Sequence, residues 1–267
     1  MVFLTYLVIM QKYFNFQGNQ MKILFSPSEA KSNFTDSNKL SDENLLFPTF
    51  FKKRLHIVEK LNSFLENNSS DNLEKFFGIK NSDECARLAK LDILNSSTCK
   101  AIQRYSGVAY QYLDFETLNN NQQKWLCKNT IIFSNLFGPL LASDTIPYYR
   151  FKQGATIDGF KPELFYKENF SEALDNYIGT DLVIDLRASF YEKFYTLTCK
   201  HITMKFIKNG KVVSHWAKAY RGKVLRELSK YQPNSIEEFE NINFSGLSIE
   251  EIIEKKLKRE YIFKIEV

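Results

Sequence analysis

The sequence is poor in the residues that bind metals or close disulfides. Its 267 residues include four cysteines and three histidines. No two cysteines form a Cys-x-x-Cys pair, and none stands at zinc-site spacing from a histidine. These residues are Cys85, Cys99, Cys127 and Cys199, with His56, His201 and His215. Isolated thiols are typical of a reducing compartment, so we expect a cytoplasmic protein without a metal or other cofactor.

The chain also lacks a long apolar run and the common catalytic signatures. The apolar stretch 2–10 is too short to span a bilayer and has neither the basic start nor the small-residue cleavage site of a signal peptide, so no membrane partner is expected. A P-loop, a nucleophile elbow and paired carboxylates are missing, which disfavours an enzyme. Met21 opens a buried strand. We therefore interpret residues 1–20 as an extension upstream of the natural start, with a short interfacial anchor as the alternative.

What is present predicts a single α+β domain over residues 21–267. The composition, 44% hydrophobic and 15% aromatic, is sufficient for a large core. Strands and helices alternate around one hairpin centred on Asn209-Gly210, which favours a central mixed sheet with surrounding helices. Expected strands are 22–25, 130–133, 181–186, 202–207, 212–216 and 261–267. Expected helices are 47–65, 73–77, 84–91, a short one ending near 105, one from 119, 162–177, 218–231 and 249–257, with 134–154 as a long loop.

Positive charge is concentrated in one segment. Residues 200–230 contain nine Lys or Arg and one acid, Glu227, giving this segment +8 whereas the whole chain carries +5. The basic residues are Lys200, Lys205, Lys208, Lys211, Lys218, Arg221, Lys223, Arg226 and Lys230. A local concentration of positive charge attracts polyanions, which raises nucleic acid as a partner. The alternative is a solvated basic surface with no partner.

Arg221 stands out on the helix expected from residue 218. At 100° per residue, Lys218 shares one arc with three other cations, Lys223, Arg226 and Lys230. Arg221 instead falls among apolar residues, directly before Gly222. A buried arginine needs either an acidic partner or a polar pocket. Gly222 favours the pocket, because a missing side chain lets a ligand approach, and the helix amino terminus would add N–H donors for phosphate.

Several blocks, in order along the chain, carry a resemblance to a known family. They are Met21–Lys31, Tyr105–Tyr110, Ser134–Leu140, Asp144–Gly154 and Ala217–Gly222, which includes Ala-Lys-Ala-Tyr-Arg-Gly. Together they resemble the YaaA family of bacterial peroxide-stress proteins. The sequence departs from the family pattern at Ser28-Glu29, Pro147 and Lys152-Gln153, and 185–189 matches it only loosely, so this chain resembles a divergent member.

The resemblance implies a compact mixed fold with a positively charged cleft. It further implies binding to double-stranded or branched DNA, a role in limiting hydroperoxide damage linked to intracellular iron, and a helix-hairpin-helix-like element. Phe76–Ile79 and the helix that follows are the local candidate, with the hairpin glycine turning backbone amides toward a phosphate. The alternative is an ordinary pair of packed helices.

The main hypothesis from these observations is a DNA-binding protein. The expected phosphate-binding residues are Lys31, Arg150, Lys218, Arg221, Gly222 and Arg226, with Lys223 and Lys230 on the rim of the cleft. Tyr105, Tyr149 and Trp216 are candidates for stacking on bases, or alternatively core residues. Because phosphate contacts give affinity without sequence choice, binding should not be sequence-specific.

Two other hypotheses stay open at this point. An enzyme acting on a nucleobase or nucleotide would bind a small nucleotide-like ligand in the same cleft, with Asp185 as general acid or base. In the alternative interpretation Asp185 caps its strand or pairs with Arg187. A scaffold or iron-handling protein without nucleic-acid contact is the third hypothesis.

Overall fold

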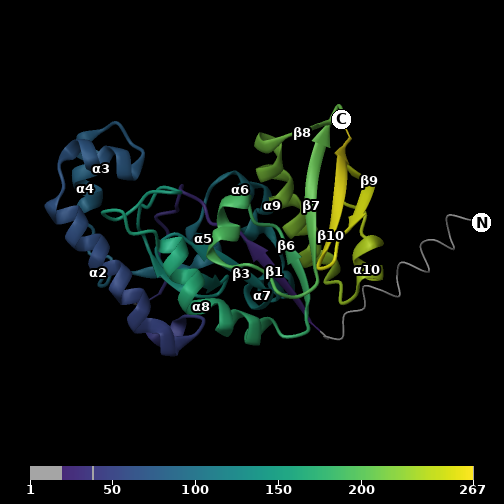
Figure 1. The fold of residues 1–267 in the computed structure, drawn as a ribbon, viewed down its shortest axis with the longest axis horizontal. Coiled ribbons are helices and arrows are strands. Elements are labelled where there is room, and N and C mark those ends of the chain that lie inside the picture. Colours follow the sequence, from purple (N-terminus) through teal and green to yellow (C-terminus); the bar gives the residue numbers. More distant parts are fainter. Residues whose placement is uncertain (1–19, 38, 267) are drawn as a thin grey trace, which may run out of the picture.

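A mixed β-sheet runs through the molecule, and helices lie around it (Figure 1). The computed structural model describes residues 20–37 and 39–266. The expected N-terminal extension, 1–20, therefore lies outside the described residues except for Gln20. In the described chain the main sheet has the order β4-β3-β1-β6-β7-β10-β9, with β8 paired to β7. Its strands are β1 (Met21–Phe25), β3 (Thr130–Ser134), β4 (Gly138–Leu141), β6 (Leu182–Asp185), β7 (His201–Lys208), β8 (Lys211–Val212), β9 (Leu247–Glu254) and β10 (Lys258–Ile265).

The centre of the sheet is parallel and its margins are antiparallel. β1 pairs in parallel with β3 and β6, β6 with β7, and β7 with β10. β4, β8 and β9 join by antiparallel pairing. Every residue of β1, β3 and β6 is buried, which explains why these strands are nearly continuous apolar runs. A separate two-stranded sheet joins β2 (Thr98–Lys100) and β5 (Thr145–Pro147).

The helices form an arm at one end of the molecule and a packed layer near its middle (Figure 1). The arm contains α2 (Phe51–Asn67), α3 (Ser70–Phe77) and α4 (Ser82–Ala89). Nearer the sheet are α5 (Ala101–Arg104), α6 (Val108–Leu113), α7 (Asn120–Asn129), α8 (Pro162–Ile178), α9 (Ser214–Tyr231) and α10 (Ile236–Glu240). Contacts join α6 to α9, α9 to β7, and α7 to β1.

A fully buried arginine fastens the arm to the sheet. The Arg54 guanidinium on α2 donates to the carbonyl oxygens of Phe137 at 2.9 Å, Leu46 at 2.7 Å and Pro139 at 2.8 Å. Burial lowers the pKa of Arg54. Several carbonyl acceptors satisfy its donors without a direct carboxylate partner, which makes this buried cation tolerable.

The structure confirms the predicted α+β class with a central mixed sheet. The three central strands, the helices of the arm and the hairpin turn at Asn209-Gly210 lie where the sequence predicted them, and Pro162 is the first residue of α8. The helix-hairpin-helix interpretation of the arm stays a prediction. Gly78, at a φ of 68°, joins α3 to the turn before α4. However, the amides of Gly78 and Ile79 both donate to Glu74 O, so they cap α3.

Four predicted elements were wrong. The segment 249–257, predicted as a helix, forms most of β9, because hydrogen bonding along β10 prevails over a helix-like spacing in an isoleucine-rich segment. The expected loop 134–154 contains β4 and β5. The expected helix before residue 105 is β2 followed by the four residues of α5. The strand expected at 212–216 ends at Val212, and α9 begins at Ser214.

Candidate functional site

A cleft of about 360 Å³ opens at the carboxyl ends of β1 and β6. Its walls come from four segments, 25–30 after β1, 107–110 at the start of α6, 186–191 after β6, and α9, and from Gln153. The carboxyl ends of adjacent parallel strands are where open α/β sheets usually place ligands, because two connections diverge there. The position in the fold, together with the hollow itself, makes this the candidate site.

Short-range contacts set the shape of the cleft. Ser26 Oγ accepts from the amide of Ala188 at 2.8 Å, which joins the loop after β1 to the loop after β6. Tyr110 Oη donates to Ser26 O at 2.8 Å and fixes α6 against the same loop. Gly107 permits the close approach of that loop, since a Cβ there would lie 2.2 Å from Ser28 Oγ. These contacts hold the loop after β1, the start of α6 and the loop after β6 together around the cleft.

Two cations on α9 line the cleft without a bonded partner. Lys218 is exposed and Arg221 is half-buried. No hydrogen bond or ion pair within the described chain involves either group. Burial lowers the pKa of Arg221, and the charges of Asp185 and Glu192 oppose that shift. A guanidinium held without a direct partner is stabilised by an incoming anion. This pair is the strongest sign of function in the cleft.

The Arg221 environment differs from the predicted one in two respects. Because α9 begins at Ser214, Arg221 lies in the second turn, so the helix amino terminus does not supply N–H donors beside it. Gly222 does not open space for a ligand either. A Cβ at Gly222 would lie 2.0 Å from the carbonyl oxygen of Ala109, so this glycine allows α9 and α6 to pack closely.

Asp185 is occupied by its own ion pair. Arg187 donates to both carboxylate oxygens, at 2.9 Å and 2.7 Å, and both side chains are buried. Arg187 also donates to the carbonyls of Tyr191 and Tyr195. The structure thus contradicts Asp185 as a free general acid or base and matches the alternative interpretation, a partner for Arg187.

Lys31 lies beneath the loop that forms the cleft wall. Its Nζ donates to Ser28 O at 3.1 Å and Glu29 O at 3.4 Å, and lies 4.1 Å from the centroid of the Tyr149 ring. Burial, together with the nearby charge of Arg150, lowers the pKa of Lys31 to about 7. Lys31 does not line the cleft, so its evident contribution is to hold the loop.

The predicted stacking residues divide into two classes. Tyr105 and Tyr149 are 2% and 1% exposed, and their hydroxyls are 2.8 Å apart. Ser134 Oγ lies 2.8 Å from the Tyr149 hydroxyl. Both tyrosines therefore belong to the core and cannot stack on a base, as the alternative interpretation held. Trp216 is 46% exposed on the first turn of α9, with Lys208 Nζ 5.2 Å from its ring.

Arg150 and Arg226 are framework residues rather than free phosphate ligands. Arg150 donates to Phe77 O at 3.2 Å and to Glu29 O at 3.2 Å, and pairs with the Glu29 carboxylate at 3.5 Å. It thereby joins the arm to the loop after β1. Arg226 donates to Leu113 O at 2.8 Å and to Asp114 O at 2.9 Å, at the carboxyl end of α6. Of the predicted cations, the structure brings only Lys218 and Arg221 together in the cleft.

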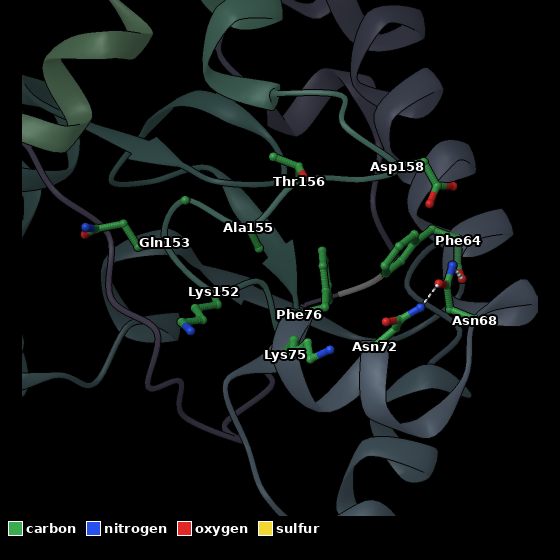
Figure 2. Close-up of a pocket in the computed structure, with 11 residues that line it drawn as sticks. Phe64, Asn68, Asn72, Lys75, Phe76, Lys152, Gln153, Ala155, Thr156 and Asp158 are labelled. Carbon is green, nitrogen blue, oxygen red and sulfur yellow. Dashed lines mark hydrogen bonds between the residues drawn. The ribbon is translucent and has the colours of Figure 1, made fainter.

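A second hollow, which the sequence did not indicate, lies between the arm and the loop at 152–158. It measures about 450 Å³, and Gln153 lines both this hollow and the cleft. In Figure 2, Asn68, Asn72 and Lys75 lie on the arm, and Lys152 and Gln153 lie on the loop across the hollow, with the Gln153 side chain pointing away from the arm. The Asn72 amide donates to Asn68 Oδ1 at 3.0 Å. Nothing in the sequence spacing indicated that residues so far apart would meet.

Among the described side chains of residues 20–37 and 39–266, no group of three or more His, Cys, Asp or Glu is arranged to hold a metal ion. Over the same residues no helix is both long and apolar enough to cross a membrane.

Comparison with known proteins identifies the family. The family model described as peroxide stress protein YaaA matches residues 21–252. An uncharacterized protein of Campylobacter jejuni is 45% identical over 245 residues, covering 92% of this chain and 99% of the relative. A UPF0246 protein of Corynebacterium glutamicum is 31% identical over 243 residues, covering 86% and 95%, and one of Fusobacterium nucleatum is 28% identical over 239 residues, covering 86% and 93%. The chain belongs to the YaaA peroxide-stress protein family, also called UPF0246.

Proposed function

We propose that this member of a peroxide-stress family binds double-stranded or branched DNA in the cleft at the carboxyl ends of β1 and β6. Lys218 and Arg221 contact backbone phosphates. The observation that carries the proposal is that both cations line a hollow and neither has a bonded partner in the described chain. One anion can pair with both cations, and phosphate, like carboxylate, has oxygens spaced to accept two N–H donors from a guanidinium.

The surroundings of the cleft favour an extended anion over a small one. Gln153 connects the cleft to the second hollow, where Lys75 and Lys152 are both exposed (Figure 2). A nucleic-acid backbone presents phosphates at regular intervals and can reach cations in both places. Trp216, two residues before Lys218, offers an exposed ring for an unpaired base at a junction. Contacts of this kind do not distinguish base sequences.

The test is a pair of charge-matched double variants on the same helix. Lys218→Gln with Arg221→Gln removes the two cleft cations. Lys223 and Lys230, expected on the rim, do not line the cleft. Lys223→Gln with Lys230→Gln removes the same charge there, where Lys230 pairs with Glu227 at 2.7 Å and Lys223 lies over the Tyr220 ring. Fluorescence anisotropy with a labelled duplex and a labelled four-way junction reports binding.

We expect the cleft variant to bind both DNAs at least about tenfold more weakly than wild type, and the control to stay within about twofold. Duplexes of unrelated sequence should bind alike. Thermal unfolding of both variants verifies that they are folded. Equal losses in the two variants would show that binding follows total charge and would remove the cleft from the account.

A further inference from the structure

We propose that a separate pocket, at the amino ends of β1 and β3, binds a small organic polyphosphate of the nucleoside-triphosphate class. The pocket measures about 560 Å³ and lies between α7, the end of β4 and the end of α8. This size suits a nucleotide. Lys100, Lys124 and Lys128 line it, and its described lining contains no carboxylate. The inference is independent of DNA binding in the cleft.

The fold places this pocket opposite the cleft. α7 ends at Asn129, and β3 begins at the next residue, so Lys128 stands at the amino end of β3. Lys128 is also close enough to Lys22, near the start of β1, for its charge to lower the pKa of Lys22. The cleft lies at the carboxyl ends of β1 and β6. One ligand of nucleotide size cannot occupy both places.

The three lysines have no bonded partner to neutralise them. The ammonium groups of Lys100, Lys124 and Lys128 make no hydrogen bond, ion pair or cation–π contact within the described chain. Lys124 and Lys128 are neighbours on one face of α7, as the i, i+4 spacing requires, and both are exposed. Like charges around one cavity repel one another, and an anion with several charges relieves that repulsion. A polyphosphate chain meets this requirement better than a single carboxylate does.

The nearest carboxylates are already engaged. Asp181 pairs with Lys22 at 3.7 Å. Asp144 accepts from the amides of Leu46 at 2.7 Å and Leu141 at 3.0 Å. Burial raises the pKa of Tyr177 and the charges of both acids add to that rise, so both acids are within electrostatic reach of the pocket wall. They therefore moderate the field of the lysines but do not bind their ammonium groups.

The remaining lining suits the organic part of the ligand. The Tyr177 ring is half-buried, and Leu141 contributes an apolar surface beside it. Asn120 and Ser143 add polar side chains at the same wall. An apolar wall with a few polar groups and a cluster of cations is the usual composition of a nucleotide pocket.

Cys127 provides a reporter inside the pocket. It is half-buried and lines the cavity, and Lys100 is close enough to influence the pKa of its thiol. Cys85 and Cys99 are buried, and the other half-buried thiol, Cys199, lies two residues before β7. In a Cys199→Ser protein, N-ethylmaleimide labels Cys127, and mass spectrometry follows the rate. The reagent is neutral, so the lysines do not attract it.

ATP and inorganic tripolyphosphate should each slow labelling of Cys127, whereas adenosine should not. Lys124→Gln with Lys128→Gln should weaken ATP binding, measured by equilibrium dialysis, by about tenfold or more. Lys223→Gln with Lys230→Gln, which removes the same charge outside both the pocket and the cleft, is the matched control and should bind ATP as wild type does. A cooperative thermal unfolding transition in each variant verifies that it is folded.

Three results would overturn the proposal. If neither equilibrium dialysis with the wild-type protein nor labelling of Cys127 shows ATP binding, the pocket does not bind polyphosphates. If the α7 variant keeps the wild-type ATP affinity, the ligand lies elsewhere. If duplex DNA protects Cys127 and ATP does not, the lysines belong to a nucleic-acid surface. None of these results depends on whether the cleft binds DNA, so the two proposals fail separately.

Discussion

The substitution Gly222→Ala tests the close packing of α9 on α6, which holds Lys218 and Arg221 at the cleft. Helix propensity alone predicts that alanine in mid-helix stabilises by about 1 kcal/mol. The structure predicts the opposite sign. The new Cβ would lie 2.0 Å from Ala109 O and 2.8 Å from its carbonyl carbon. These are backbone atoms of α6, so no side-chain rotation relieves the contact and the two helices must separate.

Overpacking of a well-packed contact typically costs about 1–3 kcal/mol, and an immovable backbone neighbour places this case at the upper end. After the gain in helix propensity, the expected net loss is about 2 kcal/mol. For a chain of this length that corresponds to a decrease in Tm of about 4–8 °C. Thermal unfolding followed by circular dichroism measures it.

Gly107→Ala is the matched control. Its Cβ would lie 2.2 Å from Ser28 Oγ and 3.0 Å from Ser28 Cβ, which are side-chain atoms. The hydroxyl can rotate away, and replacing Ser28 by glycine removes both atoms. Gly107→Ala should therefore destabilise less than Gly222→Ala, and the Ser28→Gly background should restore it. If Gly222→Ala is as stable as wild type or more so, the described contact between α6 and α9 is wrong.

Three further predictions concern the framework of the cleft. Asp185→Asn breaks a buried ion pair and should lower the free energy of unfolding by about 3–5 kcal/mol, because it leaves the Arg187 charge without compensation. Urea unfolding measures the loss, and no measurable loss would show that the pair is not buried. Arg226→Ala removes hydrogen bonds to α6 and should lower the free energy of unfolding by about 1–3 kcal/mol. An anisotropy titration should show unchanged DNA affinity, and a large loss of affinity would mean that Arg226 contacts DNA. Lys31 loses its proton near pH 7 in the folded chain but only near its ordinary pKa of 10.5 when unfolded, so between these pH values its contribution makes stability rise with pH. In urea unfolding repeated across this pH range, Lys31→Met should reduce the rise in stability. Parallel plots of stability against pH for the two proteins would refute the lowered pKa of Lys31.

Local sequence patterns correctly predicted the strands that are buried on both faces of the sheet. β1 and β3 are covered on both faces, so their apolar runs predicted strands correctly. The prediction failed at β9, because this edge strand has no buried residue and its apolar spacing does not alternate as in a half-buried strand. The start of α9 was placed four residues late for the same kind of reason. Val213 ends the hairpin without a side-chain cap, so the local sequence does not mark the first turn of the helix.

The candidate site was predictable only in part. The helical angle of Arg221 correctly predicted a cation turned away from the exposed arc, and the structure places it at a hollow. The sequence could not show that Arg150 donates to carbonyls of the arm and of the loop after β1, since those partners are distant in the chain. From the sequence, Gly222 could make room either for a ligand or for a neighbouring helix. Only the tertiary packing distinguishes the two roles.

The salt dependence of DNA binding tests the central claim most directly. If Lys218 and Arg221 each neutralise a duplex phosphate, the slope of log affinity against log salt should be shallower by about 1.8 in the Lys218→Gln, Arg221→Gln variant than in wild type. Wild type would then lose about twelvefold more affinity than the variant when salt rises from about 50 mM to about 200 mM. Parallel slopes for the two proteins would contradict the account, because they would mean that the cleft cations release no counterions from DNA.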